Sequence, residues 1–150
     1  MVSCKGNGDA PQTYDPSKPV EFDEFLPATY SIDNMAGKQI CKQSLQQEAG
    51  LAVADLPIYG MVCRLTEQKG VPLLLPALEK FLHHQVQVVI VGSGDPALAT
   101  QLQTMARDYP DKLAFINTYD DRLAHLVEAG ADFFLMPSLF EPCGLNQMYS

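Results

Sequence analysis

The sequence has no tryptophan, only three histidines and only four cysteines among its 150 residues. Cys4, Cys41, Cys63 and Cys143 stand far apart, with neither a CxxC pair nor a Cys/His cluster at metal-ligand spacing. A structural zinc site or a disulfide framework is therefore not expected, and reduced thiols are the simplest interpretation. These residue types indicate neither a metal ion nor another cofactor.

Basic residues are also scarce, because 10 Lys and Arg stand against 18 Asp and Glu, for a formal net charge of −8. A nucleic-acid-binding surface needs clustered Lys and Arg to displace counterions from phosphates, so we expect no nucleic-acid partner. No apolar run approaches the roughly 20 residues that cross a bilayer, and the first residues lack the apolar stretch of a secretory signal. We expect a cytoplasmic protein without a membrane partner.

The composition is that of a folded domain, since 47% of the residues are hydrophobic and 19% are charged. The first thirty residues contain Pro11, Pro16, Pro19 and Pro27, which interrupt any periodic pattern. We therefore interpret residues 1–33 as a segment similar to an interdomain linker, and residues 34–150 as the folded domain.

Residues 34–49 have helical periodicity. Met35, Ile40, Cys41 and Leu45 are spaced so that they fall near one helical face, which we expect to be buried. Gly50 follows as a stop signal.

Strand and helix patterns alternate in the rest of the chain. The expected strands are 58–65, 86–91, 113–117 and 131–136, and the expected helices between them are 71–82, 95–107 and 120–128. Residues 86–91 are nearly continuous in apolarity, which is typical of a parallel strand covered on both faces. The order predicts an α/β fold with a doubly wound parallel sheet. Such a sheet normally has about five or six strands, so the domain is expected to be partial.

Ligands of open α/β sheets bind beyond the carboxyl ends of the strands, and three loops occupy that position. In the first, Arg64 and Lys69 could converge on a diphosphate near a helix N-terminus. The alternative is a solvated pair of cations that forms an ion pair with Glu67.

The second loop, 91–95, contains Gly92 and Gly94 but falls short of the GxGxxG pattern. Its glycines would allow a ligand or another part of the backbone to approach closely. A tight turn with Asp95 as the helix N-cap explains the same residues without a ligand.

In the third loop, Glu141 could accept hydrogen bonds from sugar hydroxyls. The backbone N–H groups that follow, at Gly144, Leu145 and Asn146, could face an anion. An ordinary helix entry, with an acidic residue complementing the helix dipole, is the alternative. Tyr119, just after a strand, could stack on a base or simply cover the core.

Five motifs occur in order along the chain: KxxCKxxLQ at 38–46, RLTEQKG at 64–70, GSGD at 92–95, YDxxLAH at 119–125 and LMPSxFEPCGL at 135–145. Together they resemble the bacterial glycogen synthase and plant starch synthase family of retaining GT-B glycosyltransferases. The resemblance implies a Rossmann-like half of a GT-B fold, namely part of the C-terminal, donor-binding domain.

By this resemblance, Arg64 and Lys69 neutralise the diphosphate of the donor, and Glu141 is the essential carboxylate, which contacts the donor glucose. Tyr119 stacks on the adenine ring. The remaining implied substrate-binding residues are Cys143, Gly144, Leu145 and Asn146.

The implied reaction transfers glucose from ADP-glucose to the non-reducing end of an α-1,4-glucan with retention, and it needs no metal. The family's N-terminal domain, with its acceptor groove, is missing from the sequence. We therefore expect donor binding with negligible turnover, in the cytoplasm or, for a plant-type protein, in a plastid. Another GT-B nucleotide-sugar transferase and a non-catalytic nucleotide-binding fragment remain alternatives.

Three positions depart from the family pattern. Leu139 and Leu126 each stand where the family commonly has Arg, and Asn146 stands in place of Thr. Leucine supplies neither charge nor a hydrogen-bond donor, so the support of Glu141 is expected to differ from the family's.

Overall fold

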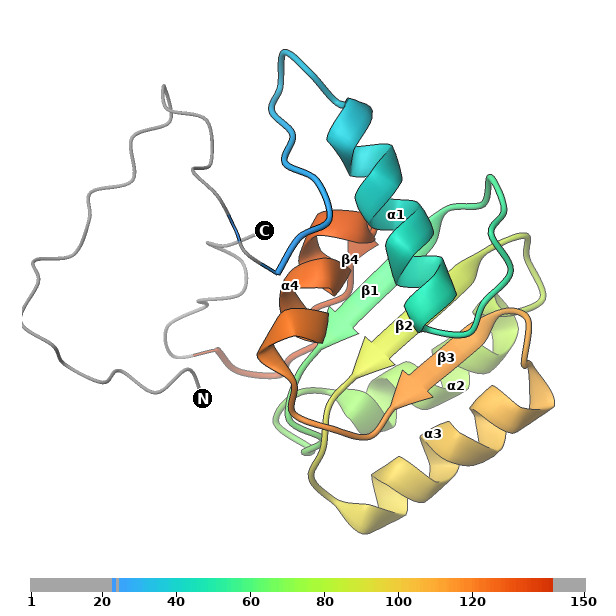
Figure 1. Cartoon of the computed structure of the whole chain (residues 1–150). Helices are drawn as coiled ribbons and strands as arrows, with labels where there is room; N and C mark the ends of the chain where they lie inside the picture. Colours follow the sequence, from blue (N-terminus) through green and yellow to red (C-terminus); the bar gives the residue numbers. More distant parts are fainter. Residues whose placement is uncertain (1–22, 24, 142–150) are drawn as a thin grey trace, which may run out of the picture.

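The fold is a parallel sheet between two pairs of helices (Figure 1). The computed structural model describes residue 23 and residues 25–141. Its elements, in chain order, are α1 (Ala36–Glu48), β1 (Ile58–Val62), α2 (Val71–Phe81), β2 (Gln87–Val91), α3 (Pro96–Asp108), β3 (Leu113–Ile116), α4 (Asp121–Gly130) and β4 (Phe133–Phe134). The strands pair in the order β3-β2-β1-β4, always in parallel. The predicted α/β class and the parallel sheet are confirmed.

Strand β2 explains why residues 86–91 are so apolar. All five of its residues are buried, and it pairs with β1 on one side and β3 on the other. Successive side chains point to opposite faces of the sheet, so both faces of this strand need a cover. Helices α1 and α4 cover one face, and α2 and α3 cover the other (Figure 1).

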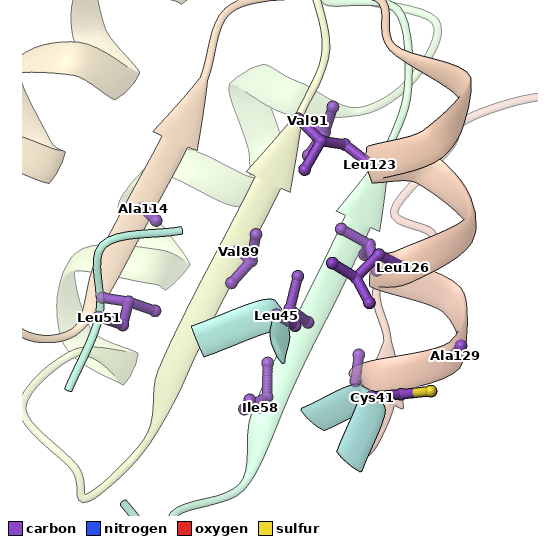
Figure 2. Packing of buried hydrophobic residues seen from close by; sticks show 12 residues of the cluster. Cys41, Leu45, Leu51, Ile58, Val89, Val91, Ala114, Leu123, Leu126 and Ala129 are labelled. Atoms are coloured by element: carbon purple, nitrogen blue, oxygen red, sulfur yellow. The ribbon is translucent and has the colours of Figure 1, made fainter. Parts of the chain in front are cut away.

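Each face of the sheet has its own hydrophobic core. On the α1/α4 face, Val89 and Val91 of β2 pack with Leu45 of α1 and Leu126 of α4 (Figure 2). On the α2/α3 face the residues include Met61, Leu78, Val88, Ile90 and Leu102. Full burial of such a side chain contributes about 1.5–3 kcal/mol, so the two cores hold the helices firmly on the sheet.

Aspartates cap α3, as the sequence predicted, and also α4. The Asp95 carboxylate accepts hydrogen bonds from the backbone N–H groups of Ala97 and Leu98 at the start of α3. The Asp120 carboxylate accepts one from Leu123 N in α4. Each cap satisfies donors that a helix start leaves unpaired, which is worth about 1 kcal/mol.

The expected buried face of α1 was wrong for two residues. Met35, which precedes the helix, and Ile40 are about half exposed. The buried residues of α1 are Gly37, Cys41, Lys42, Leu45 and Gln46. Two of these residues are polar, and burial is possible because each finds hydrogen-bond partners far away in the sequence.

Two strands are shorter than predicted. β1 ends at Val62 rather than at residue 65, and β4 has only two residues where 131–136 was expected. β4 pairs with β1 alone, because it lies at the edge of the described sheet. Residues 135 and 136 therefore follow the strand, although their apolar side chains continue its sequence pattern.

A polar network joins α1 to the amino ends of β1 and β4. Lys42 Nζ lies 2.7 Å from Asp132 Oδ2, and the same oxygen accepts the backbone N–H of Ile58 at 2.8 Å. Lys38 Nζ donates to the carbonyls of Ala129 and Ala131 at the C-terminal end of α4. These bonds place a positive charge where the helix dipole is negative and fix α1 against α4.

Residues before α1 also contact the domain. The Tyr30 hydroxyl donates to Ala129 O at 3.0 Å, and His125 lies 2.6 Å from Asp23 Oδ2. Leu26 and Tyr30 pack against the core of the α1/α4 face. The domain boundary between residues 33 and 34 stays a prediction.

Candidate functional site

The strand order creates a switch point between β1 and β4. From β1 the chain goes by α2 to β2 on one side, whereas β4 arrives on the other side of β1. Connections that diverge in this way leave a crevice beyond the carboxyl ends of the two strands, where open α/β sheets bind ligands. The loops that flank this crevice are 63–70, after β1, and 135–141, after β4.

Lys69 and Glu141 meet at the switch point. Lys69 Nζ lies 2.5 Å from Glu141 Oε1, and the Ser138 hydroxyl donates to the same oxygen at 2.6 Å. The side chains of Lys69 and Glu141 are 20% and 25% exposed, so the pair is accessible without being fully solvated. Lys69 thus forms its ion pair with Glu141, and not with Glu67 as the alternative interpretation had it.

These contacts control the ionisation of the site. The hydrogen bonds from Lys69 and Ser138 lower the pKa of Glu141, so its carboxylate is charged at neutral pH. Burial raises the pKa of the nearby Cys63 thiol to about 11, partly opposed by the Lys69 charge. Cys63 is therefore a neutral thiol at neutral pH, which is a poor nucleophile.

The two loops are joined by their backbones as well as by the ion pair. Leu139 N donates to Gln68 O at 2.9 Å, and Gln68 Nε2 donates to Phe140 O at 3.1 Å. Gly70 has a φ of 70°, and a Cβ there would collide with the carbonyl of Pro137. A residue without a side chain is thus required for the loops to approach this closely.

The glycine-rich loop after β2 is explained by another part of the backbone. Leu65 N donates to Ser93 O, and Asp95 N donates to Leu65 O, both at 2.9 Å. A Cβ on Gly92 or Gly94 would collide with the carbonyl of Cys63 or Leu65, respectively. With Asp95 as a helix cap, these contacts account for the motif without a ligand.

The other predicted site residues have different positions. Arg64 is exposed in the same loop as Lys69 and forms no ion pair within the described part of the chain. Tyr119 follows β3, which β2 separates from β1, and its side chain is 56% exposed. The structure thus brings Lys69 and Glu141 into contact, but not Tyr119. The predicted residues Cys143, Gly144, Leu145 and Asn146 lie outside the described residues.

Two of the three departures from the family pattern can be located. Leu126 is fully buried in the core between α4 and the sheet, where a guanidinium would have to be buried among apolar side chains. Leu139 lies beside the site, but its side chain is 61% exposed and its contact with Gln68 is made through its backbone. Asn146 is not among the described residues.

Of two hollows on the surface that the structure describes, only one lies at the switch point. A small one of about 10 Å³ at the switch point is lined by residues that include Cys63, Lys69, Ser138 and Glu141. A wider groove lies between α2 and α3, with Glu79, Gln101 and Tyr109 in its lining. The groove is on the outer helical face, away from the strand ends, so we place the candidate site at the smaller hollow. Ligand pockets usually measure roughly 300–1,000 Å³, so the small hollow, with room for about one water molecule, marks the site but would not enclose a nucleotide sugar.

Sequence reasoning did not single out Ser138, Gln68 or Cys63. All three lie within or beside the motifs after β1 and β4; the Gln68 contact crosses to the other loop, Ser138 contacts Glu141 within its own loop, and Cys63 lines the hollow between them. The only sequence signal for these three residues was that they stand near Lys69 or Glu141 in the chain. That nearness does not show which atoms they contact.

Residue 23 and residues 25–141 contain no group of three or more His, Cys, Asp and Glu side chains that could hold a metal ion. In the same part of the chain, no helix is both long and apolar enough to span a membrane.

Comparison with known proteins places this geometry in a family. The model of the family "Glycosyl transferases group 1" matches residues 43–148. Glycogen synthase from Aeromonas hydrophila is 80% identical over 144 residues, which are 96% of this chain and 29% of that protein. Glycogen synthase from Vibrio parahaemolyticus is 60% identical over 133 residues, or 87% of this chain and 27% of the relative.

A solved structure is also similar. It is the catalytic domain of starch synthase IV from Arabidopsis thaliana bound to ADP and acarbose, with a TM-score of 0.78 and 34% identity. The match covers 85% of this chain and 27% of that one. The chain thus spans less than a third of the length of these proteins. The resemblance drawn from the five motifs is confirmed, and the chain belongs to the family of group 1 glycosyltransferases.

Proposed function

We propose that this chain binds a nucleoside-diphosphate sugar at the carboxyl ends of β1 and β4, as the donor-binding part of a glucosyltransferase that extends an α-1,4-glucan. The observation that carries the proposal is the contact between Lys69 and Glu141 at the switch point. A cation and a carboxylate side by side match a ligand that carries a phosphate next to a hydroxyl-rich sugar.

Lys69 and Arg64 would bind the diphosphate. Both belong to the loop that leads into α2, which begins at Val71, so the positive end of the helix dipole faces the same region. An anion here would gain charge-assisted hydrogen bonds together with the dipole. In transfer, the same cations would offset the negative charge that develops on the leaving diphosphate.

Glu141 would bind the sugar. Among the described residues, its hydrogen bonds from Lys69 and Ser138 both go to Oε1, and Oε2 would accept a hydrogen bond from a sugar hydroxyl. Its lowered pKa keeps this acceptor charged at neutral pH. We assign retention at the anomeric carbon on the basis of the family resemblance.

Tyr119 would stack on the base, and the backbone at Cys143, Gly144, Leu145 and Asn146 would contact sugar hydroxyls and phosphate. An exposed ring just beyond a strand end is suited to stacking. The Arabidopsis starch synthase was solved with ADP, which supports adenine as the base. The relatives named glycogen synthase support glycogen as the acceptor and a bacterial cytoplasm as the location.

Isothermal titration of the chain with ADP, ADP-glucose and UDP-glucose tests the proposal. We expect ADP-glucose to bind more tightly than UDP-glucose, and Arg64→Ala to weaken ADP binding by roughly tenfold or more, since one charge-assisted hydrogen bond is worth about 1.5–3 kcal/mol. The matched control is Arg107→Ala, because Arg107 is exposed on α3 and pairs only with its neighbour Asp108. No binding by the unmodified chain would refute the proposal, and tighter binding of UDP-glucose would favour another nucleotide-sugar transferase.

A coupled assay of ADP release with glycogen present separates binding from transfer. We expect negligible turnover by the 150-residue chain, which spans 29% of the length of its Aeromonas relative. Holding donor and acceptor in a reactive geometry lowers a barrier by about 7–11 kcal/mol, and this requires an acceptor site as well. Robust turnover would show that the chain holds the acceptor by itself.

A further inference from the structure

Glu141 depends on its loop for its position. It is the last residue that the structure describes, seven residues after the end of β4, so the sheet does not hold it directly. Within the described part of the chain, its carboxylate contacts Lys69 and Ser138, and the two residues before it, Leu139 and Phe140, have backbone hydrogen bonds to Gln68. Gln68 therefore holds the stretch of backbone from which the carboxylate reaches Lys69.

Gln68 holds this loop at two points. Its backbone carbonyl accepts the N–H of Leu139 at 2.9 Å, and its side-chain amide donates to the carbonyl of Phe140 at 3.1 Å. One hydrogen bond would let the loop pivot, whereas two on neighbouring residues fix both its position and its direction. The next residue along each chain segment after this clamp is a member of the ion pair, Lys69 on one side and Glu141 on the other.

We propose that Gln68 is a positioning residue, whose side-chain amide orients the 139–141 backbone so that the Glu141 carboxylate faces Lys69 and the bound sugar. The part of this inference that concerns the sugar rests on the proposed function. The part that concerns the orientation of Glu141 rests on the contacts alone.

The position requires an amide of this length. Any residue can offer the backbone carbonyl to Leu139, so only the Phe140 contact depends on the side chain. Asparagine is one methylene shorter, glutamate has no N–H to donate, and methionine has a similar length but is no donor. Gln68 is itself exposed, so its side chain adds little to the core, and its loss is a local change.

The variant Gln68→Met removes the donor while keeping the length of the side chain. The matched control is Gln103→Met, because Gln103 is an exposed glutamine on α3. Thermal unfolding of both variants should stay within a few degrees of the unmodified chain, as expected for the loss of one exposed hydrogen bond.

The first readout is the titration of the Glu141 carboxyl by carbon-13 NMR, with Glu141→Gln used to assign the signal. The bonds from Lys69 and Ser138 lower the pKa of Glu141. We expect Gln68→Met to move this pKa up towards the ordinary glutamate value, and Gln103→Met to leave it unchanged. An unchanged pKa in Gln68→Met would overturn the inference about orientation.

The second readout compares two ligands by titration calorimetry. Gln68→Met should weaken ADP-glucose binding by roughly threefold to tenfold, which corresponds to about 0.7–1.4 kcal/mol, and should leave ADP binding unchanged. ADP lacks the sugar that Glu141 would contact. An equal loss for both ligands would mean a general structural role and would overturn the inference. If the unmodified chain binds neither ligand, the proposed function and the sugar contact fail together, and the NMR titration still decides the orientation of Glu141.

Discussion

Two lysine–carboxylate pairs lie at opposite ends of β1 and β4, and they differ in what surrounds them. Lys42 and Asp132 lie at the amino ends, where the Lys42 side chain is only 8% exposed and Asp132 also accepts the backbone N–H of Ile58. Lys69 and Glu141 lie at the carboxyl ends, beside a hollow, with 20% and 25% exposure. Similar residues at similar distances therefore have different environments.

The difference suggests a division of roles. At the amino ends, Asp132 Oδ2 is shared by a lysine and a backbone N–H, so this oxygen is already committed to the fold. At the carboxyl ends, Glu141 Oε1 likewise takes two donors, but both come from side chains of the strand-end loops, and the pair borders a hollow that a ligand can reach. We expect the first pair to matter mainly for stability and the second mainly for binding.

The largest expected effect is on stability, for Asp132→Ala. This change leaves a buried lysine without its carboxylate and also removes the acceptor of Ile58 N. We expect the free energy of unfolding to fall by about 3 kcal/mol, at the low end of the range for breaking buried pairs, because the Asp132 side chain is 30% exposed. Urea denaturation measures this loss. Asp111→Ala, at an exposed loop position, should cost less than about 0.5 kcal/mol.

A loss below about 1 kcal/mol for Asp132→Ala would remove the distinction between the two pairs, since that is the usual value of a surface ion pair.

The next effect is on binding, for Lys69→Ala. We expect the free energy of unfolding to stay within about 1 kcal/mol of the unmodified chain, because the pair is partly exposed. The Kd for ADP should rise roughly tenfold or more, since a charged donor to the diphosphate is lost. Lys80→Ala, in the last turn of α2, is the control for removing a lysine from an exposed position. If Lys69→Ala were as destabilising as Asp132→Ala, both pairs would be structural.

The smallest expected effect is a pH dependence of stability that comes from Glu141. Its pKa is lower in the folded chain than the ordinary value of 4.5, so the folded state binds its proton less readily than the unfolded state does. The pair therefore contributes stability above the ordinary pKa, and this contribution is lost as pH falls through the folded pKa. The Tm difference between the unmodified chain and Glu141→Gln should be largest near neutral pH and vanish in strong acid. An equal Tm difference at neutral pH and in strong acid would contradict a lowered pKa of Glu141 in the folded chain.

Most of the architecture could be predicted from local patterns. The β-branched run of β2, the aspartate caps of α3 and α4, and the glycine that ends α1 act within a few residues of themselves, so they can be read without a tertiary structure. The orientation of α1 could not be predicted reliably. Met35 and Ile40 are more apolar than Lys42 and Gln46, yet the polar pair is buried because its partners come from the 52–58 segment, β2 and the start of β4.

The candidate site divides in the same way. Strand-end loops and the charges on them were visible in the sequence, and the five motifs identified the family that the comparisons confirm. The partners within the site were not visible, because the Gln68 and Lys69 contacts depend on how two loops approach one another.

The sequence by itself determined a parallel α/β domain, the order of its helices and strands and the family to which it belongs, because periodicity, caps and motif spacing are local properties. Only the tertiary structure decided that Lys69 meets Glu141, 72 residues away, rather than Glu67 in its own loop. That contact exists because β4 pairs with β1, and the order of strands in a sheet is set by how whole helices pack on its faces. The same packing decided which of the two lysine–carboxylate pairs is buried and which is left open to a ligand.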